Sequence, residues 1–347
     1  MNARRIGPAL DLVDGRVEMA HGAGGRSMQQ LIAQVFAREL DNVWLSQGDD
    51  GARLPGCDAR LVMATDAHVV SPLFFPGGDI GALSVHGTIN DVAVMGARPL
   101  WLAAGFVLEE GFPLADLARI VASMARASRE AGVPVVTGDT KVVEHGKADG
   151  VFITTTGVGA LRDDVDLSGS NARPGDVVLL SGTIGDHGMA ILSVRENLAF
   201  ESPIISDTAA LHSLIAGLLD AVPDTRVLRD PTRGGLAATL NEIAEQSAVG
   251  IALEESRIPV RPAVLAACEL LGLDPLNIAN EGRVVAICPR EGAERAVAAM
   301  RAHPLGTGAA IIGEVVADER RFVRMSTRFG GQRMIDWLAG DALPRIC

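Results

Sequence analysis

Aspartates beside glycine, threonine or asparagine recur along the sequence and are the first residues that indicate chemistry. They occur in five short segments: Asp49-Asp50-Gly-Ala, Thr65-Asp66, Asn90-Asp91-Val-Ala, Gly138-Asp139-Thr-Lys141 and Asp230-Pro-Thr-Arg-Gly-Gly235. Carboxylates around one cleft repel one another and raise each other's pKa unless cations lie among them. Magnesium prefers oxygen ligands and bridges carboxylates to nucleotide phosphates. Any single aspartate is more simply explained as a turn or cap residue, but the series favours a magnesium and nucleotide site.

A glycine-rich segment precedes the first expected helix. Gly22, Gly24 and Gly25 would let backbone N–H groups approach an anion closely, and the helix expected from Ser27 would point its positive end the same way. The spacing matches neither a Walker A loop nor a dinucleotide-binding fingerprint. A phosphate-binding loop and a glycine turn without a ligand are therefore equally good interpretations.

The chain ends on a cysteine, Cys347, which follows Pro344, Arg345 and Ile346. About a dozen extended residues before it could span ~40 Å, so the terminal thiol could visit two places as a swinging arm does. Because an ordinary thiol has a pKa of ~8.5, Cys347 would need a site or a partner to activate it. A prenylation signal is excluded, since three residues must follow the modified cysteine. An accidental terminal cysteine is the alternative.

The other cysteines give no sign of chemistry. Cys57 lies in a Pro-Gly turn, Cys268 and Cys288 fall in apolar segments, and no spacing indicates a zinc site or a disulfide framework. Among the 31 basic residues only Lys141 and Lys147 are lysine. The place of Lys141 within a motif suggests chemistry that arginine cannot supply, although a bias in base composition would also explain the count.

The composition narrows the class of protein. The chain has 347 residues and a formal charge of −12, which disfavours a nucleic-acid partner and an anionic membrane surface. Its longest apolar run, Leu100 to Leu108, is about half the ~20 residues of a spanning helix, and Pro8 and Asp11 interrupt any export signal. We therefore expect a cytoplasmic protein of two domains.

Strand and helix patterns alternate along the chain, which predicts an α+β protein with mixed α/β layers. In the first half we expect strands at 61–64, 100–108, 133–137 and 151–157, and helices at 79–95 and 113–131, the latter bounded by Pro113 and Gly132. In the second half we expect a strand at 176–181 and helices at 206–221, 236–246 and 291–301.

A polar, turn-rich segment at 162–174 separates the halves and divides the chain into parts. These are a leader with the glycine-rich loop and first helix (1–44), an ATP-binding domain (45–161), a second domain (174–322) and a mobile tail (323–347). Five arginines and no acid lie between Arg320 and Arg333. They could dock the tail on carboxylates or on a partner.

Taken together, the motifs resemble those of the HypE family of hydrogenase maturation factors. The segments that carry the resemblance, from about His21 to the last residue, are His21-Gly-Ala-Gly-Gly-Arg, Asp49-Asp50-Gly-Ala, Phe74-Phe75-Pro-Gly-Gly78, Asn90-Asp91-Val-Ala-Val-Met-Gly96, Val136-Thr-Gly-Asp-Thr-Lys141, Ser181-Gly-Thr-Ile-Gly-Asp-His187, Asp230-Pro-Thr-Arg-Gly-Gly235, Asn280-Glu-Gly282 and Pro344-Arg-Ile-Cys347. The terminal motif separates this family from its relatives, the aminoimidazole ribonucleotide synthetases, selenophosphate synthetases and thiamine-phosphate kinases. The resemblance implies a two-domain architecture like theirs with a flexible C-terminal tail.

The resemblance also implies a reaction, in which ATP drives dehydration of a carbamoyl group on the terminal cysteine to a thiocyanate. HypF would supply the carbamoyl group, and the HypC–HypD complex would receive the cyanide for the iron of [NiFe] hydrogenase. Relatives form homodimers, so we expect one here, with the ATP site near that interface. ATP and Mg²⁺ would be the cofactors.

The resemblance assigns roles to individual residues. Metal ligands would be Asp50, Asp66, Asp91 and Asp230, and the nucleotide would contact Gly22, Gly24, Gly25, Asp49, Asp66, Asn90, Asp91, Asp139, Thr140 and Arg233. Lys141 and Glu281 would polarise or deprotonate the carbamoyl group carried by Cys347. We favour Glu281 as the base and Lys141 as a cation for the transferred phosphate, and His145 is a further catalytic candidate.

Two other functions fit parts of the sequence. A synthetase that acts on a free small molecule would keep its activity after deletion of Cys347. A thiol carrier without catalytic activity would bind its partner but would not turn over ATP.

Overall fold

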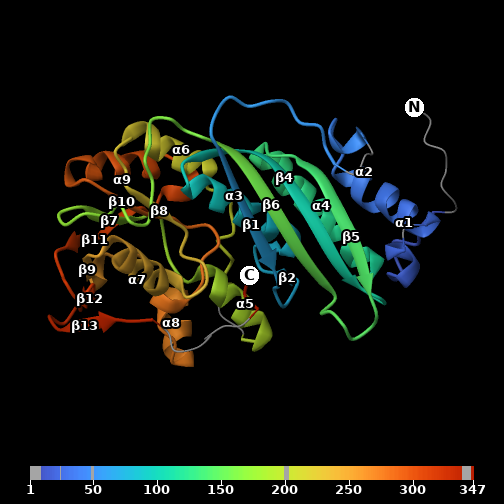
Figure 1. Cartoon of the computed structure of the whole chain (residues 1–347). Helices are drawn as coiled ribbons and strands as arrows, with labels where there is room; N and C mark the ends of the chain where they lie inside the picture. Colours follow the sequence, from blue (N-terminus) through green and yellow to red (C-terminus); the bar gives the residue numbers. More distant parts are fainter. Residues whose placement is uncertain (1–8, 24, 48–50, 199–202, 338–344) are drawn as a thin grey trace.

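The computed structural model describes residues 9–23, 25–47, 51–198, 203–337 and 345–347 of the chain. Two large β-sheets with helices packed on them lie side by side, and the end of the chain lies between them (Figure 1). A small two-stranded sheet pairs β2 (Phe74–Phe75) with β3 (Gly78–Asp79). This arrangement confirms the predicted α+β class with its mixed layers.

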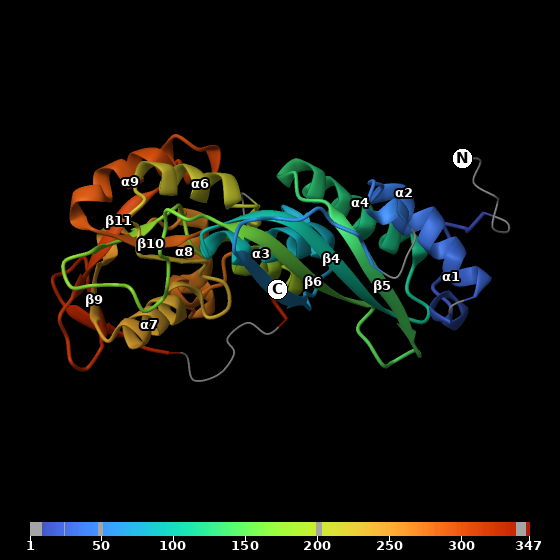
Figure 2. The ribbon, with the colours of Figure 1, turned by 45° about the horizontal axis from the view of Figure 1, so that its top comes forward.

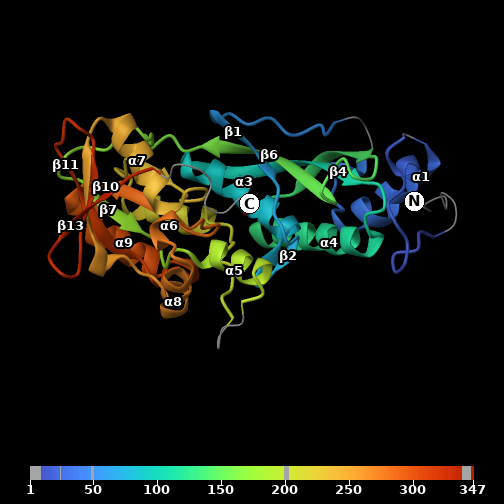
Figure 3. The ribbon, with the colours of Figure 1, turned by 90° about the horizontal axis from the view of Figure 1, so that it is seen from below.

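The first sheet has the strand order β1-β6-β4-β5, and its strands pair antiparallel except for β4 with β5. Its strands are β1 (Leu61–His68), β4 (Ala97–Glu109), β5 (Val135–Val143) and β6 (Val151–Leu161). Helices α3 (Ile80–Val94) and α4 (Leu114–Ala131) cover one face and leave the other open (Figure 3). On the open face the side chains of Leu61 and Met63 are apolar and exposed.

The predicted bounds of α4 are confirmed, since Pro113 precedes it and Gly132, in the left-handed conformation with φ 68°, ends it. The predicted strands in β1 and β5 were too short. Pairing with neighbouring strands carries β1 on to residue 68 and β5 on to residue 143. Asp66 and Asp139 therefore lie within strands, and not beyond the strand ends predicted at residues 64 and 137.

The second sheet has seven strands in the order β13-β12-β9-β11-β7-β10-β8. They are β7 (Val177–Leu180), β8 (Val227–Arg229), β9 (Gly250–Glu254), β10 (Val285–Cys288), β11 (Ala310–Val316), β12 (Val323–Ser326) and β13 (Gln332–Ile335). Helices α6 (His212–Ala221) and α9 (Ala293–Arg301) lie on one face, and α7 (Gly235–Ser247) lies on the other (Figure 2). Each face has its own apolar core.

Two further helices connect the halves of the molecule. Met189 of α5 (Asp186–Arg195) and Cys268 of α8 (Pro262–Leu271) are buried in the same core as the helices of the first sheet. Because these helices belong to the second half of the chain, the core crosses the boundary between the halves. It brings the start of α5 close to the end of β1.

The N-terminal segment lies along β5 and α4. Helix α1 (Arg26–Leu31) continues through a π-helical stretch (Ile32–Phe36) into α2 (Ala37–Glu39). The ring of Phe36 contacts that of Phe106 on β4 edge to face, with 4.9 Å between centroids. Gly22 lies directly against β5, where a Cβ atom would come within 2.7 Å of the Val142 nitrogen.

The structure corrects two predictions in the second half. The helix expected from residue 206 begins only at His212. The side chains of Ser206 and Asp207 hydrogen-bond distant groups, His187 and the Glu281 amide, and do not form part of a helical turn. The tail expected from residue 323 is also shorter, since β12 pairs with β9 and β13 pairs with β12. Of the five arginines between Arg320 and Arg333, three form ion pairs within the second half: Arg321 with Glu245, Arg324 with Asp318 and Arg333 with Asp274.

Candidate active site

The last three residues of the chain are held in the middle of the molecule (Figure 1). The Val69 amide donates to the terminal carboxylate of Cys347 at 3.1 Å, and the Ser71 amide donates to the Arg345 carbonyl at 3.2 Å. Ile346 is 3% exposed and belongs to the first core. Residues 345–347 thus lie beside residues 69–71 as a short strand would.

The thiol of Cys347 contacts a carboxyl group. It hydrogen-bonds the side chain of Glu281, which is 4% exposed. Burial and the nearby Glu281 raise the pKa of the Cys347 thiol far above its ordinary value, and Arg233 opposes them only in part. The docked thiol is therefore protonated and is not a nucleophile.

Glu281 is a buried acid with unused hydrogen-bonding capacity. Burial raises its pKa well above the ordinary value, and Asp230 and Asp207 raise it further. Its Oε1 atom has no hydrogen-bond partner among the described residues. The backbone is fixed by Asp207, whose carboxylate accepts hydrogen bonds from the amides of Glu281 at 3.1 Å and Gly282 at 3.3 Å. A base that is held in place and strongly basic once deprotonated is suited to proton abstraction.

Three of the predicted aspartates lie together beside Glu281. Burial, Asp230 and Asp66 raise the pKa of Asp91 to about 7, and burial is the main cause that raises the pKa of Asp230 to about 6. Gly87, one turn before Asp91 on α3, gives these groups room, because a Cβ there would lie 3.3 Å from Asp66 Oδ2 and 3.9 Å from Glu281 Oε2. Carboxylates at such close quarters suit a hard divalent cation. The buried ring of His68 lies beside them, with its Nε2 atom 3.6 Å from Asp66 Oδ2.

A second group of predicted residues lies on β5. Lys141 Nζ and Asp139 Oδ2 are 3.0 Å apart, and both side chains are exposed. Strand β5 forms one edge of the first sheet and β1, with Asp66, forms the other. Three strand spacings, about 14 Å, separate these edges. Within one chain, Lys141 is therefore remote from Cys347 and Glu281.

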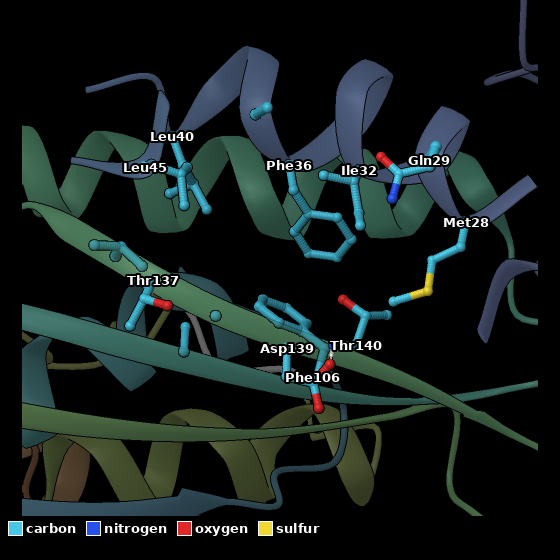
Figure 4. Close-up of a pocket in the computed structure, with 14 residues that line it drawn as sticks. Met28, Gln29, Ile32, Phe36, Leu40, Leu45, Phe106, Thr137, Asp139 and Thr140 are labelled. Atoms are coloured by element: carbon cyan, nitrogen blue, oxygen red, sulfur yellow. Dashed lines mark hydrogen bonds between the residues drawn. The ribbon is translucent and has the colours of Figure 1, made fainter. Parts of the chain in front are cut away.

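A cavity of about 260 Å³ opens between the N-terminal helices and β4 and β5 (Figure 4). Ile32, Phe36 and Phe106 give it apolar walls, and Asp139 and Thr140 line one side. Apolar walls beside a few polar groups are typical of small-molecule sites. The cavity could accept a flat ring system.

The remaining predicted residues have other surroundings. His145 is exposed and pairs with Glu109 at 3.1 Å, away from the buried cluster. The Asn90 amide donates to the carbonyls of Ala209 and Glu281 and accepts from the Leu211 amide, so it joins α3 to a loop of the second half. Asn90 thus joins the two halves of the chain next to Asp91, and its contact with the nucleotide stays a prediction.

Arg233 is exposed, and its charge lowers the pKa of both Cys347 and Asp91. Gly25 precedes α1 and has open space around its Cα atom. Gly24, Asp49 and Asp50 lie outside the described residues. Within the parts of the chain that are described, no three His, Cys, Asp or Glu side chains are already arranged as a metal centre.

Two groups at the site were not predicted from the sequence. Asp207 fixes the backbone of Glu281, and His187 contacts the docked tail through a hydrogen bond of 2.8 Å from its Nε2 atom to the Ile346 carbonyl. The motif Ser181 to His187 contributes to the family resemblance, but the resemblance assigns no role to His187. Asp207 had no signal, because it lay in a segment that we expected to be helical.

Comparisons with known proteins agree with this architecture. The AIR synthase related protein, N-terminal domain, matches residues 48–161, and the AIR synthase related protein, C-terminal domain, matches residues 173–326. The fold and the acidic cleft thus define a protein of the AIR synthase related class.

Relatives place the chain more narrowly. It is 69% identical to carbamoyl dehydratase HypE of Azotobacter vinelandii over 97% of this chain and 99% of the relative. A solved structure of hydrogenase maturation protein HypE in complex with ATP is 49% identical and superposes with a TM-score of 0.92 over 95% of this chain and 99% of that one. A structure of the HypE-HypF complex gives a TM-score of 0.78 at 50% identity over 89% of this chain and 99% of that one. The chain belongs to the HypE family of carbamoyl dehydratases.

Proposed function

We propose that this chain uses ATP to dehydrate a carbamoyl group on the sulfur of Cys347 to a thiocyanate. In the maturation of [NiFe] hydrogenase, this step supplies the cyanide ligand of the active-site iron. The observation that carries the proposal is the contact between the terminal thiol and the buried carboxyl group of Glu281. A group attached to that sulfur would lie beside a base in a cleft that excludes most water.

The chemistry needs a leaving group and the loss of two protons. The carbamoyl oxygen attacks the γ-phosphorus of ATP, the bond from that phosphorus to the bridging oxygen breaks, and ADP leaves. The nitrogen loses one proton as the O-phosphorylated intermediate forms. Removal of the second proton forms the C≡N triple bond while the C–O bond breaks and phosphate departs. The sulfur keeps its carbon throughout, so Cys347 carries the substrate and is not the catalyst.

Glu281 is the proposed base. Its raised pKa means that it must first lose its own proton, and positive charge in the cleft would help because it stabilises the carboxylate. Lys141 is the proposed cation for the transferred phosphate. Its side chain is exposed and pairs with Asp139, and a lysine ammonium group offers a compact point charge to a phosphate.

Asp66, Asp91 and Asp230 are the proposed ligands for magnesium, and Asp50 is a further expected ligand. The raised pKa values of Asp91 and Asp230 support this, because burial first and neighbouring carboxylates second disfavour their charged forms, which a bound cation would stabilise. A bound magnesium ion would neutralise phosphate charge near these groups.

We further propose that two copies of the chain form a homodimer through the open face of the first sheet. Leu61 is 57% exposed and Met63 is 73% exposed on that face, so a second copy would remove apolar surface from water. Lys141 and Asp139 are exposed at one edge of the same sheet, and the acidic cluster lies at the other edge. A second copy could thus bring its Lys141 to the Cys347 of the first.

The same arrangement suggests where ATP binds. The cavity beside Asp139 and Thr140 would hold the base of the nucleotide, and the loop at Gly22 and Gly25 would contact the phosphates. The phosphates of an ATP molecule bound at the β5 edge of one copy would then point toward the acidic cluster of the other copy.

Mixing two inactive variants tests the shared site. Lys141→Ala and Cys347→Ala homodimers would each be inactive, but a mixed dimer would contain one complete site if Lys141 acts across the interface. Activity should therefore return after subunit exchange. If every site lay within one chain, no mixed dimer would contain a complete site and activity would stay absent.

HypF is the proposed carbamoyl donor, and the HypC–HypD complex is the proposed acceptor of the cyanide. Loading requires the tail to leave the cleft, because the docked thiol is buried and protonated. Among the described helices, none has the length and apolar character needed to cross a bilayer. We propose a cytoplasmic location for the reaction.

The central test is the mass of the C-terminal peptide. After incubation with HypF, carbamoyl phosphate and ATP, we expect a carbamoyl adduct at Cys347 that then loses one water. Cys57, which is exposed, serves as the internal control. An unmodified Cys347 would overturn the assignment.

A further inference from the structure

We propose that His187 is a positioning residue that seats the substrate-bearing C-terminus for reaction by holding the carbonyl of Ile346. This inference rests on the proposed function, since it concerns how the group on Cys347 meets Glu281. It also gives a role to the motif Ser181 to His187, which no step of the chemistry uses.

The hydrogen bonds of His187 define its tautomer. Its Nε2 atom lies 2.8 Å from the Ile346 carbonyl oxygen, which can only accept, so Nε2 carries the proton. Its Nδ1 atom lies 2.7 Å from Ser206 Oγ. The ring is completely buried, and burial lowers its pKa, so the ring is neutral and Nδ1 accepts the Ser206 hydroxyl proton. The Thr208 amide donates to Ser206 Oγ at 3.1 Å, so the Ser206 hydroxyl proton is free to be donated to His187.

The ring is also fixed by packing. Phe75 contacts it edge to face, with 5.4 Å between ring centroids and an angle of 89° between the planes. His187 follows Asp186, the first residue of α5, so its backbone is held by the helix. The donor that faces Ile346 is therefore preorganised before the tail arrives.

His187 acts at the residue next to the reacting cysteine. Other contacts hold the tail one residue earlier: Arg195 donates to the Arg345 carbonyl, and the Arg345 side chain pairs with Asp149. The side chain of Ile346 is buried in the core. Among the described side chains that hold the tail by hydrogen bonds or ion pairs, His187 thus controls the peptide unit that leads directly into Cys347.

One loop connects this seat to the base. Ser206 orients His187, and the adjacent Asp207 holds the amides of Glu281 and Gly282. A Cβ on Gly282 would overlap the Asp207 carbonyl oxygen at 1.7 Å, so the loop and the base are packed without spare room. The position of the sulfur and the position of the Glu281 carboxyl group are therefore set by neighbouring residues of one segment.

The test uses full-length protein whose Cys347 has been carbamoylated beforehand. On addition of ATP, His187→Ala should form thiocyanate about tenfold more slowly in a single turnover, the effect of losing one buried hydrogen bond. The KM for ATP should not change. His187→Gln, whose side-chain amide retains an N–H donor, should recover part of the rate. His303→Ala, in the second half and away from the tail, is the matched control.

A second measurement tests whether His187 holds the C-terminus in place, independently of the reaction. Iodoacetamide should label Cys347 faster in His187→Ala than in the wild-type chain, because the undocked thiol is more accessible, while labelling of Cys57 stays the same. Unchanged labelling and an unchanged single-turnover rate in a folded His187→Ala variant would overturn the proposal. If the wild-type chain formed no thiocyanate, the proposed function would fail, but the labelling experiment would still decide whether His187 holds the tail.

Discussion

Replacement of Asp91 by asparagine should make the chain more stable and less active at the same time. Burial, together with Asp230 and Asp66, raises the pKa of Asp91 from 3.8 to about 7. The folded chain therefore keeps a proton that the unfolded chain releases at lower pH. The contribution that this retained proton makes to the free energy of unfolding is complete below pH ~4 and is lost as the pH rises through about 7. Above that range, the buried charge costs free energy.

The size of the effect follows from the shift. Each pKa unit corresponds to ~1.4 kcal/mol, so about three units give roughly 4 kcal/mol at high pH. Asp91→Asn removes the charge with little change in shape. We expect the variant to exceed the wild-type chain in free energy of unfolding by up to this amount at pH 8.5 without divalent ions, and to match it near pH 4.

Denaturant unfolding between pH 4 and 8.5 measures this difference. Asp116→Asn is the control, because Asp116 lies half-buried at the start of α4, outside the acidic cluster, and pairs with Arg119. Added Mg²⁺ should stabilise the wild-type chain more than the variant, and dehydration should be lost in Asp91→Asn. If the variant were the less stable protein at pH 8.5 without divalent ions, the argument from buried charge would be wrong.

Two other substitutions probe the same cleft. Gly87→Ala should change the free energy of unfolding by no more than about 1 kcal/mol, because alanine favours the helix while its methyl group crowds Asp66. Turnover in an ATPase assay should nevertheless fall at least tenfold. Unchanged turnover would mean that the reaction does not use the space at Gly87. Glu281→Gln should accept the carbamoyl group but not dehydrate it, and in the wild-type chain the single-turnover rate should rise with pH because Glu281 must lose its proton first. Intact mass measures both, and a rate that falls with rising pH would exclude Glu281 as the base.

Periodicity and caps were enough to predict much of the fold. The bounds of α4 follow from Pro113 and Gly132, and the alternation of elements gave the two layered halves. The tail was misjudged because Gly and Arg in residues 323–335 suggested a mobile chain. The partner of β12 is β9, some seventy residues earlier, and local sequence carries no information on such pairing.

The sequence was sufficient to predict those site residues that belong to motifs. It was not sufficient to predict which of them lie close together in the folded chain. Asp66, Asp91 and Asp230 come from three separate segments, and the structure places them beside Glu281 and Cys347. The sequence could not reveal that Lys141 lies on the far edge of the sheet, because strand order is set by the pairing of β4 with both β5 and β6.

The seat of Cys347 has a consequence for how the protein is made. The Cys347 oxygen that accepts from the Val69 amide belongs to a carboxylate only after the ester bond between the chain and its transfer RNA has been hydrolysed. A chain without Cys347 would lack both its substrate carrier and the contact that Cys347 makes with Val69 in the cleft. A fused C-terminal tag would replace that carboxylate by an amide and extend the chain into a packed interior. Tags for biochemical work on this protein therefore belong at the N-terminus.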